Sequence, residues 1–342
     1  MYTFKTTEQT QEKGSDYETY SLLYLLGMHS QSDDIQYVLV DCFNDTTGLD
    51  ENATRLWDIQ AKGHKTLNPK KIGRILFTLF DNYVSDFPFV DFILIVQNID
   101  KKYLIDSTIS LFGIINFEEN VRRKIELGLH DEYIRRYKIA DELLYEKHKE
   151  KYFLENVKFK IWTLSKSDTV KTMVVFRDAS IKNEDFYESI FNEIRDKQSS
   201  LKNYNVEGLV ISQPSEALQL NKHIGKTEIT TLLINRIIGA ELFTQINVPP
   251  ALIKYLPSNN VEDIKDLIIE CNSAISKTFF NKNNRKNIWK LLEEIVSMVT
   301  KNDNKSVQEY QNMIPQKLKE QVHSLDDLQL KFLIAKVLEG VK

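Results

Sequence analysis

Apolar positions in the N-terminal third of the chain switch between the helical period of about 3.6 residues and the short apolar runs of strands. The pattern predicts, in order, a helix, two strands joined by a turn, a second helix and a third strand. These elements lie at residues 14–29, 36–43, 54–62, 68–84 and 89–96. Residues 44–52, between the first two strands, are rich in Asn, Asp, Thr and Gly, so we interpret them as a loop. This alternation of helices and strands indicates the α/β class.

The remainder of the chain becomes increasingly helical towards the C-terminus. Residues 117–151 form a charged, helical stretch. Residues 157–164 and 169–176 are predicted to be a hairpin around the turn Ser165–Asp168. From residue 184 onward, nearly every window has helical periodicity.

This change in pattern predicts two domains, residues 1–210 of mixed α/β type and residues 211–342 as an all-helical module. The 342-residue chain has 42% hydrophobic and 27% charged residues, which is an ordinary composition for a folded protein. Its two cysteines, Cys42 and Cys271, provide neither a disulfide framework nor a cysteine-based zinc site. Such sparse use of cysteine is typical of a reducing cytoplasm.

Charge and hydropathy narrow the possible function classes. A net charge of −4 excludes a globally basic nucleic-acid coat but allows a local basic surface. No apolar run reaches the roughly 20 residues of a membrane span, and the first residues lack the apolar core of a secretion signal. We therefore expect a cytoplasmic protein with no membrane partner.

The second predicted strand carries polar residues on one face. In the run WDIQAK, strand alternation places Asp58, Gln60 and Lys62 on the same side. Asp45 follows the first strand directly and can lie beside them, and Glu18 on the first helix offers another carboxylate. Carboxylate and carbonyl oxygens suit a hard cation such as Mg²⁺, and a nearby lysine can hold an attacking water and oppose phosphate charge. The pattern predicts metal-assisted hydrolysis of phosphodiesters.

The arrangement of a helical Glu18, then Asp45, then Gln60-x-Lys62 resembles the D…(E/Q)xK core of the PD-(D/E)XK nuclease superfamily. More narrowly, three segments are similar to the double-stranded-DNA endonuclease domain shared by effectors of CBASS, Lamassu and HerA-linked anti-phage systems. These segments are Tyr17–Tyr20, Asn44–Gly48 and Asp58–Lys62. The resemblance covers about residues 14–100, with an extension towards residue 210.

The resemblance implies a restriction-endonuclease-like mixed sheet flanked by helices, and cleavage of double-stranded DNA that depends on Mg²⁺ or Mn²⁺. It implies that Asp45, Gln60 and Glu18 hold the metal and that Lys62 acts at the nucleophile, so that all four are catalytic residues. Gln60 stands where the superfamily more often has Glu, and a neutral ligand binds Mg²⁺ less strongly than a carboxylate. Asp58 would compensate for this if it faced the same pocket.

A stretch rich in cations follows the second strand. Residues 59–80 contain no acidic residue. Besides Lys62, the cationic candidates for contacts with DNA are Lys65, Lys70, Lys71, Arg74 and the neighbouring His64. We predict that they neutralise phosphates, although a solvated helix face is the plainer alternative. Arg135 and Arg136 lie among acidic residues on a charged helix, where we expect surface ion pairs.

We therefore predict a Mg²⁺-dependent deoxyribonuclease with little sequence preference, because phosphate contacts carry no sequence information. As an anti-phage effector, it would stay inactive until ATPase sensor subunits of SMC-like or HerA-like type release it, or until it forms a homo-oligomer. Two alternatives stay open. One is a non-cleaving DNA- or partner-binding subunit on the same fold, and the other is a helical adaptor whose N-terminal motif is coincidental.

Overall fold

The computed structural model describes residues 1–4, 12–137, 147–176, 178, 181–243, 247–257, 260–301 and 305–341. The chain forms two compact units. One contains residues 1–169 and 191–226, and the other contains residues 170–190 and 227–342. The division expected at residues 210 and 211 concerns independently folding domains and stays a prediction.

Within the described residues, the first unit is built on a mixed sheet of seven strands in the order β6-β7-β5-β4-β3-β2-β9. The strands are β2 (Ile35–Val40), β3 (Thr46–Asp50), β4 (Leu56–Lys62), β5 (Phe89–Val96), β6 (Leu111–Gly113), β7 (Lys158–Ile161) and β9 (His223–Gly225). β4, β5 and β7 are parallel, whereas the remaining neighbours pair antiparallel. A separate antiparallel pair joins β1 (Tyr2–Thr3) to β8 (Val210–Ile211).

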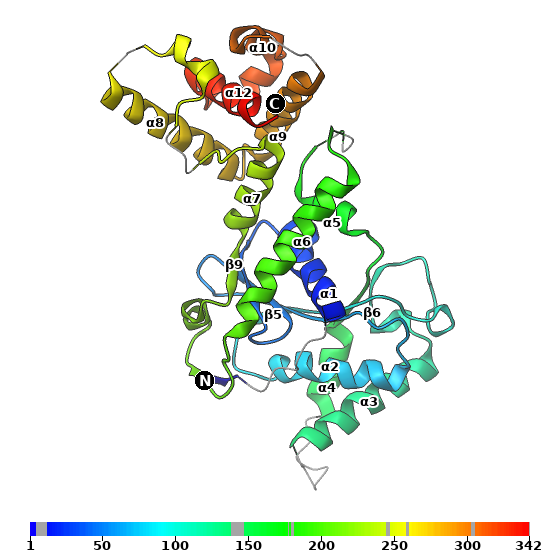
Figure 1. The fold of residues 1–342 in the computed structure, drawn as a ribbon. Helices are drawn as coiled ribbons and strands as arrows, with labels where there is room; N and C mark the ends of the chain where they lie inside the picture. The colour runs from blue at the N-terminus through cyan, green and yellow to red at the C-terminus, as the bar shows by residue number, and fades with distance from the viewer. Residues whose placement is uncertain are drawn as a thin grey trace. The chain divides into compact units, whose positions relative to one another are not determined.

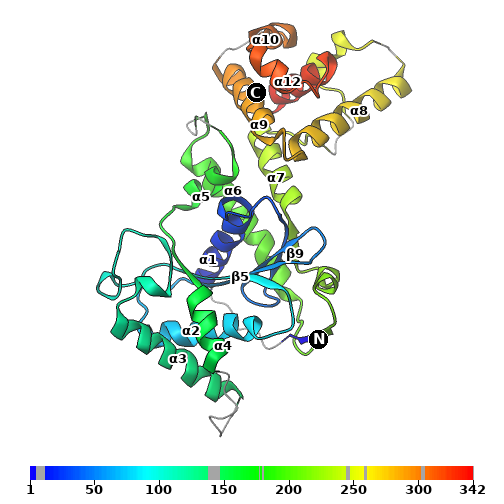
Figure 2. The ribbon, with the colours of Figure 1, turned by 180° about the vertical axis from the view of Figure 1, so that it is seen from behind.

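Helices cover both faces of the large sheet (Figure 1, Figure 2). On one face lie α1 (Glu12–Leu23) and the part of α6 (Glu184–Ser200) that follows Phe191; on the other lie α2 (Pro69–Tyr83), α3 (Glu119–Tyr137) and α4 (Lys147–Asn156). The short helical turns are η1 (Tyr24–Met28), η2 (Lys101–Tyr103), η3 (Ile114–Asn116), η6 (Leu201–Asn203) and η7 (Pro214–Leu220). The predicted mixed α/β sheet flanked by helices is confirmed, and its restriction-endonuclease-like character stays a prediction.

The N-terminal elements follow the sequence pattern with one exception. β5 has the predicted bounds, and α2 begins after Asn68, whose side chain accepts a hydrogen bond from the Lys71 N–H. The loop predicted at residues 44–52 is wrong, because Thr46–Asp50 form β3. Pairing with β2 on one side and β4 on the other overrides the turn-forming composition of this segment.

The hairpin predicted at residues 157–176 is also wrong. Its first half contains β7, which pairs with β5 and β6, but its second half contains the helix α5 (Lys166–Met173). Ser165 Oγ accepts a hydrogen bond from the Asp168 N–H at 3.0 Å and donates one to the Asp168 carboxylate at 2.7 Å. The supposed turn is therefore a helix N-cap.

The described part of the second unit is helical. Its helices are α7 (Lys226–Ile238), η8 (Pro250–Tyr255), α8 (Val261–Phe280), α9 (Arg285–Lys301), α10 (Val307–Met313), α11 (Gln316–Gln321) and α12 (Asp327–Val341). α12 packs against η8, α8, α9 and α10, so the expected helical C-terminal region is confirmed. Nowhere in the described ranges is a helix both long enough and apolar enough to cross a membrane.

Two glycines bring α2 and α3 into close contact. A Cβ atom at Gly73 would overlap the carbonyl oxygen of Ile125, and one at Gly128 would overlap the carbonyl oxygen of Lys70. α2 also packs on the sheet through buried residues that include Ile72. This packing places α3 beside α2, so that polar residues from both helices reach the same region of β4.

Candidate active site

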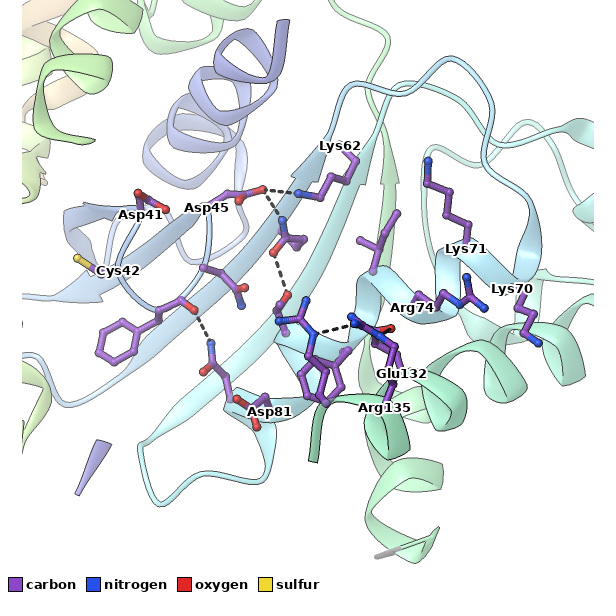
Figure 3. A pocket seen from close by; sticks show the side chains of 18 of the residues that line it. Asp41, Cys42, Asp45, Lys62, Lys70, Lys71, Arg74, Asp81, Glu132 and Arg135 are labelled. Atoms are coloured by element: carbon purple, nitrogen blue, oxygen red, sulfur yellow. Dashed lines mark hydrogen bonds and ion pairs between the residues drawn. The ribbon is translucent and has the colours of Figure 1, made fainter. Parts of the chain in front are cut away.

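A cavity of about 520 Å³ lies at the C-terminal end of β4 (Figure 3). Its wall is formed by the turn 41–45, by β4, by α2 and by the C-terminal end of α3. The sequence-predicted site residues that line it are Asp45, Gln60, Lys62, Lys70, Lys71 and Arg74. Glu18, His64 and Lys65 are not part of this wall.

Asp45 receives its hydrogen bonds on one oxygen. Its Oδ2 accepts from Gln60 Nε2 at 2.5 Å and from the Ala61 N–H at 2.8 Å, and lies 3.9 Å from Lys62 Nζ. Its Oδ1 accepts no hydrogen bond from the described residues. Burial raises the pKa of Asp45, while the Lys62 charge acts in the opposite direction.

Gln60 connects Asp45 to helix α2. While its Nε2 donates to Asp45, its Oε1 accepts a hydrogen bond from Thr78 Oγ1 at 2.9 Å. Both ends of the amide therefore have partners within the protein. The cavity wall thus contains a continuous chain of hydrogen bonds from the turn through β4 to α2.

Asp58 lies behind the cavity wall, on the predicted face of β4. Its carboxylate is fully buried and accepts hydrogen bonds from Asn44 Nδ2 at 2.5 Å, Asn82 Nδ2 at 2.7 Å and Thr47 Oγ1 at 3.0 Å. Burial raises the pKa of Asp58 to about 7, despite these hydrogen bonds, which lower it. Asp58 does not line the cavity, so the expectation that it compensates for Gln60 as a direct ligand is not met.

Glu18 lies on α1 with a buried carboxylate that is paired with Lys202 of η6. Burial raises the pKa of Glu18 to about 7, and the nearby charge of Asp45 adds to this effect. The two carboxylates therefore interact electrostatically, although only Asp45 lines the cavity. A role for Glu18 as a metal ligand stays a prediction.

The cations on α2 lie across the cavity from Asp45 and Lys62 (Figure 3). Lys71 and Arg74 are exposed, and Lys70 Nζ lies 2.6 Å from the Asp131 carboxylate of α3. The cavity therefore has an acidic site on one side and a basic surface on the other.

Several residues of this wall were not predicted from the sequence. The ion pairs expected for Arg135 and Arg136 are confirmed, because both bind Glu132, but both arginines also line the cavity. Thr78 and Asn82 line it as well. Thr78 and Asn82 could have been identified from the sequence, because two polar residues four apart lie on the same face of a largely apolar helix. The two arginines could not, because they reach the cavity only through the packing of α3 against α2.

The oxygen donors on the wall determine whether a divalent cation fits. Across the described residues, no group of three or more His, Cys, Asp or Glu side chains is arranged to hold a metal ion. The wall carries four carboxylates, those of Asp41, Asp45, Asp81 and Glu132. The side-chain oxygen of Gln60 accepts a hydrogen bond from Thr78. Mg²⁺ commonly binds one or two carboxylates and completes its coordination with water and substrate phosphate. The Asp41 and Asp45 carboxylates therefore fit an open Mg²⁺ site that substrate would complete, and Gln60 would join them only by giving up its bond to Thr78.

Comparisons with known proteins give one similar structure. No protein-family model matches the sequence, and no curated protein matches it well enough to count as a relative. The chain is similar to an Acinetobacter baumannii Cap4 SAVED/CARF-domain containing receptor that was solved with the cyclic trinucleotide 2'3'3'-cAAA. The identity is 11%, the similarity covers 86% of this chain and 67% of that chain, and the TM-score is 0.37. At this TM-score, the similarity assigns neither a fold family nor an activity.

Proposed function

We propose that the first unit is a metal-dependent deoxyribonuclease that hydrolyses phosphodiester bonds in double-stranded DNA. The observation that carries the proposal is the meeting of Asp45, Gln60 and Lys62 on one wall of a cavity whose opposite wall is basic. These residues come from a turn and a strand that are separated in the sequence.

The basic wall would hold the DNA backbone. Lys71 and Arg74 of α2, with Arg135 and Arg136 of α3, offer cations to successive phosphates. Glu132 binds both arginines and restricts their orientation. Contacts of this kind do not read bases, so we expect cleavage with little sequence preference.

The acidic wall would carry the chemistry. Asp45 would hold Mg²⁺ or Mn²⁺ through its carboxylate, and Gln60 would join it once its amide turns over and Oε1 leaves the Thr78 hydroxyl. The bound cation would neutralise phosphate charge and lower the pKa of water. Lys62, whose Nζ lies 3.9 Å from Asp45 Oδ2, would donate hydrogen bonds to the attacking water and oppose the charge that develops on the phosphate oxygens. Loss of the Lys62 ammonium should therefore lower the rate of cleavage more than the affinity for DNA.

The motif resemblance extends this proposal to a cytoplasmic effector of an anti-phage system. An uncontrolled nuclease of low specificity would degrade the host genome. We therefore propose that ATPase sensor subunits, or self-association through the helical second unit, activate the enzyme. Constitutive degradation of DNA by the pure protein at physiological Mg²⁺ would contradict this control.

A second candidate is a non-cleaving DNA- or partner-binding subunit. The hydrogen bonds of Gln60 favour it, because the amide is satisfied at both ends by Asp45 and Thr78 without a metal. A neutral amide also gains less than a carboxylate from binding a cation. The two candidates differ in a single measurable property, which is metal-dependent cleavage.

Cleavage of supercoiled plasmid tests the proposal. Wild type, Lys62→Ala and Lys65→Ala would be incubated with Mg²⁺, Mn²⁺ or EDTA at several protein concentrations, with and without the products of neighbouring genes. Lys65→Ala is the matched control, because this exposed lysine lies outside the cavity wall. We expect metal-dependent cleavage that falls about 100-fold or more in Lys62→Ala only. DNA binding without cleavage under every condition would overturn the nuclease proposal and favour the second candidate.

A further inference from the structure

Two parallel layers of hydrogen-bonded side chains join the turn 41–45, strand β4 and helix α2. The outer layer contains Asp45, Gln60 and Thr78. The inner layer has the same construction, with Asn44, Asp58 and Asn82 as its members. The corresponding residues of the two layers are neighbours on each element. They are adjacent on the turn (44 and 45), two apart on the strand (58 and 60) and four apart on the helix (78 and 82), so they lie on the same face of β4 and of α2.

The inner layer also holds the turn by a hydrogen bond from α2 to its backbone. Asp58 Oδ2 accepts hydrogen bonds from both Asn44 and Asn82, and Asn82 Nδ2 also lies 3.4 Å from the Phe43 carbonyl oxygen. Asn82 Oδ1 in turn accepts a hydrogen bond from the Tyr2 hydroxyl at 2.7 Å. Asp58 is therefore the common acceptor that ties the turn to α2.

The turn itself has a backbone conformation that needs such support. Asp41 has φ of 52°, in the left-handed region that non-glycine residues seldom adopt, and its N–H donates to the Asp45 carbonyl oxygen at 3.2 Å. The buried Lys222 ammonium lies 3.7 Å from the Asp41 carboxylate. Strained conformations persist where the surroundings over-determine them, and they cluster at functional sites.

We propose that Asp58 is a positioning residue for the cation site: through Asn44 and Asn82, it holds the turn 41–45 in the conformation in which the Asp45 carboxylate faces Gln60. The link to a metal rests on the proposed function. The effect of Asp58 on the conformation of the turn does not depend on that function. Asp58 itself lies behind the wall and contacts no substrate. Outer partners of this kind typically change metal affinity by about 10- to 100-fold when they are removed.

The first variant is Asp58→Leu, which has a side chain of similar size but no hydrogen-bond acceptor. The NH₂ groups of Asn44 and Asn82, which both donate to Asp58 Oδ2, would lose their common acceptor. We expect Mn²⁺ affinity, measured by the loss of the free-ion electron paramagnetic resonance signal, to fall about tenfold or more. We also expect hydrogen exchange in the peptide that covers residues 41–47 to accelerate about tenfold or more.

The second variant is Asp58→Asn, whose amide oxygen can take the place of Oδ2 and accept from both Asn44 and Asn82. Its NH₂ group would then face the Thr47 hydroxyl, which can accept a hydrogen bond. We therefore expect Asp58→Asn to keep Mn²⁺ affinity and hydrogen exchange within about threefold of wild type. Asp50→Asn is the control. Asp50 is also a buried aspartate of this sheet and accepts hydrogen bonds from Thr54 and the Arg55 N–H, but it does not line the cavity. It should lower thermal stability without a change in Mn²⁺ affinity.

The inference is overturned if Asp58→Leu is folded and keeps both wild-type Mn²⁺ affinity and wild-type hydrogen exchange, or if Asp50→Asn changes Mn²⁺ affinity equally. A loss in Asp58→Asn as large as that in Asp58→Leu would also overturn it. If Asp58→Leu does not fold, Asn44→Ser removes only the arm to the turn and is judged by the same criteria. A wild-type protein that binds no Mn²⁺ would contradict the proposed function. The hydrogen-exchange data would then test only whether Asp58 stabilises the turn.

Discussion

Gln60 Nε2 lies 2.5 Å from Asp45 Oδ2, so the glutamine donates to the carboxylate with which it would share a cation. Gln60→Glu would replace this donor with a second carboxylate. Without metal, repulsion between the two charges should lower the melting temperature, whereas with Mg²⁺ the additional charge should strengthen binding. We expect Mg²⁺ to raise the melting temperature of Gln60→Glu by several degrees more than that of wild type.

Thermal unfolding in EDTA and in a Mg²⁺ series measures both effects. Thr78→Val is the matched control, since it releases Gln60 Oε1 without adding a charge. Equal responses of wild type and Gln60→Glu to Mg²⁺ would show that this pair does not hold the cation.

Lys71 and Lys65 are both exposed lysines, but only Lys71 lines the cavity. Lys71→Ala should weaken DNA binding and reduce the slope of log affinity against log salt by about 0.9, the value for one lost phosphate contact. Lys65→Ala should leave the slope unchanged. Fluorescence anisotropy at several salt concentrations, in EDTA to prevent cleavage, measures both slopes. Identical slopes in the two variants would argue against the cavity as the DNA site.

Gly73 permits the close approach of α2 and α3. Alanine usually stabilises a helix by about 1 kcal/mol relative to glycine, but at this position its Cβ would overlap the Ile125 carbonyl oxygen. We expect Gly73→Ala to lower the free energy of unfolding by about 1–3 kcal/mol and to weaken DNA binding by moving Arg135 and Arg136. Gly113→Ala, where an added Cβ would meet nothing within 4 Å, should change the stability by less than about 0.5 kcal/mol in urea unfolding.

Asp91 and His29 are buried, and Asp91 lies 3.0 Å from His29 Nε2 and 2.7 Å from Nζ of the partly exposed Lys158. Burial raises its pKa, but the hydrogen bonds from His29 and Lys158 outweigh burial and hold it below the ordinary 3.8. Because the folded-state pKa is lowered, the stabilisation is present above the unfolded-state pKa and is lost as the pH falls through the folded-state value. Asp91→Asn should therefore cost about 1–3 kcal/mol at pH 7 and progressively less below pH 3.8.

Urea unfolding of wild type and Asp91→Asn between pH 7 and pH 3 measures this difference. Asp86→Asn serves as the exposed control and should have little effect at any pH. A difference between wild type and Asp91→Asn that stayed constant to pH 3 would rule out the charge as its source.

Glu150 is buried, and its Oε1 has no hydrogen-bond partner among the described residues. Burial raises its pKa to about 8, and the charge of Glu126 adds to the effect. A folded-state pKa above the unfolded 4.5 means that the folded protein binds more protons between these values, so stability falls as the pH rises from 4.5 to 8. Glu150→Gln should match wild type near pH 4 and exceed it by about 1–2 kcal/mol above pH 8 in urea unfolding. A wild-type advantage at pH 9 would contradict this prediction.

Patterns among neighbouring residues predict much of the secondary structure of the first unit. Strand alternation correctly places Asp58 and Gln60 on one face of β4, because the direction of a side chain follows from its own backbone. Asn68 and Pro69 identify the start of α2, since capping involves only neighbouring residues. Ser165 and Asp168 carried the corresponding signal for α5, which the hairpin interpretation overlooked.

The sequence by itself determined the α/β class, the polar face of β4 and the helical character of the C-terminal region, because each depends on periodicity within one segment. Tertiary structure alone decided that Thr46–Asp50 becomes a strand, since its pairing partners lie in two other strands. It also decided that Lys202 pairs with Glu18 and that the α3 arginines reach the cavity. These contacts depend on how closely distant elements pack, and a pattern along one segment contains no information about that distance.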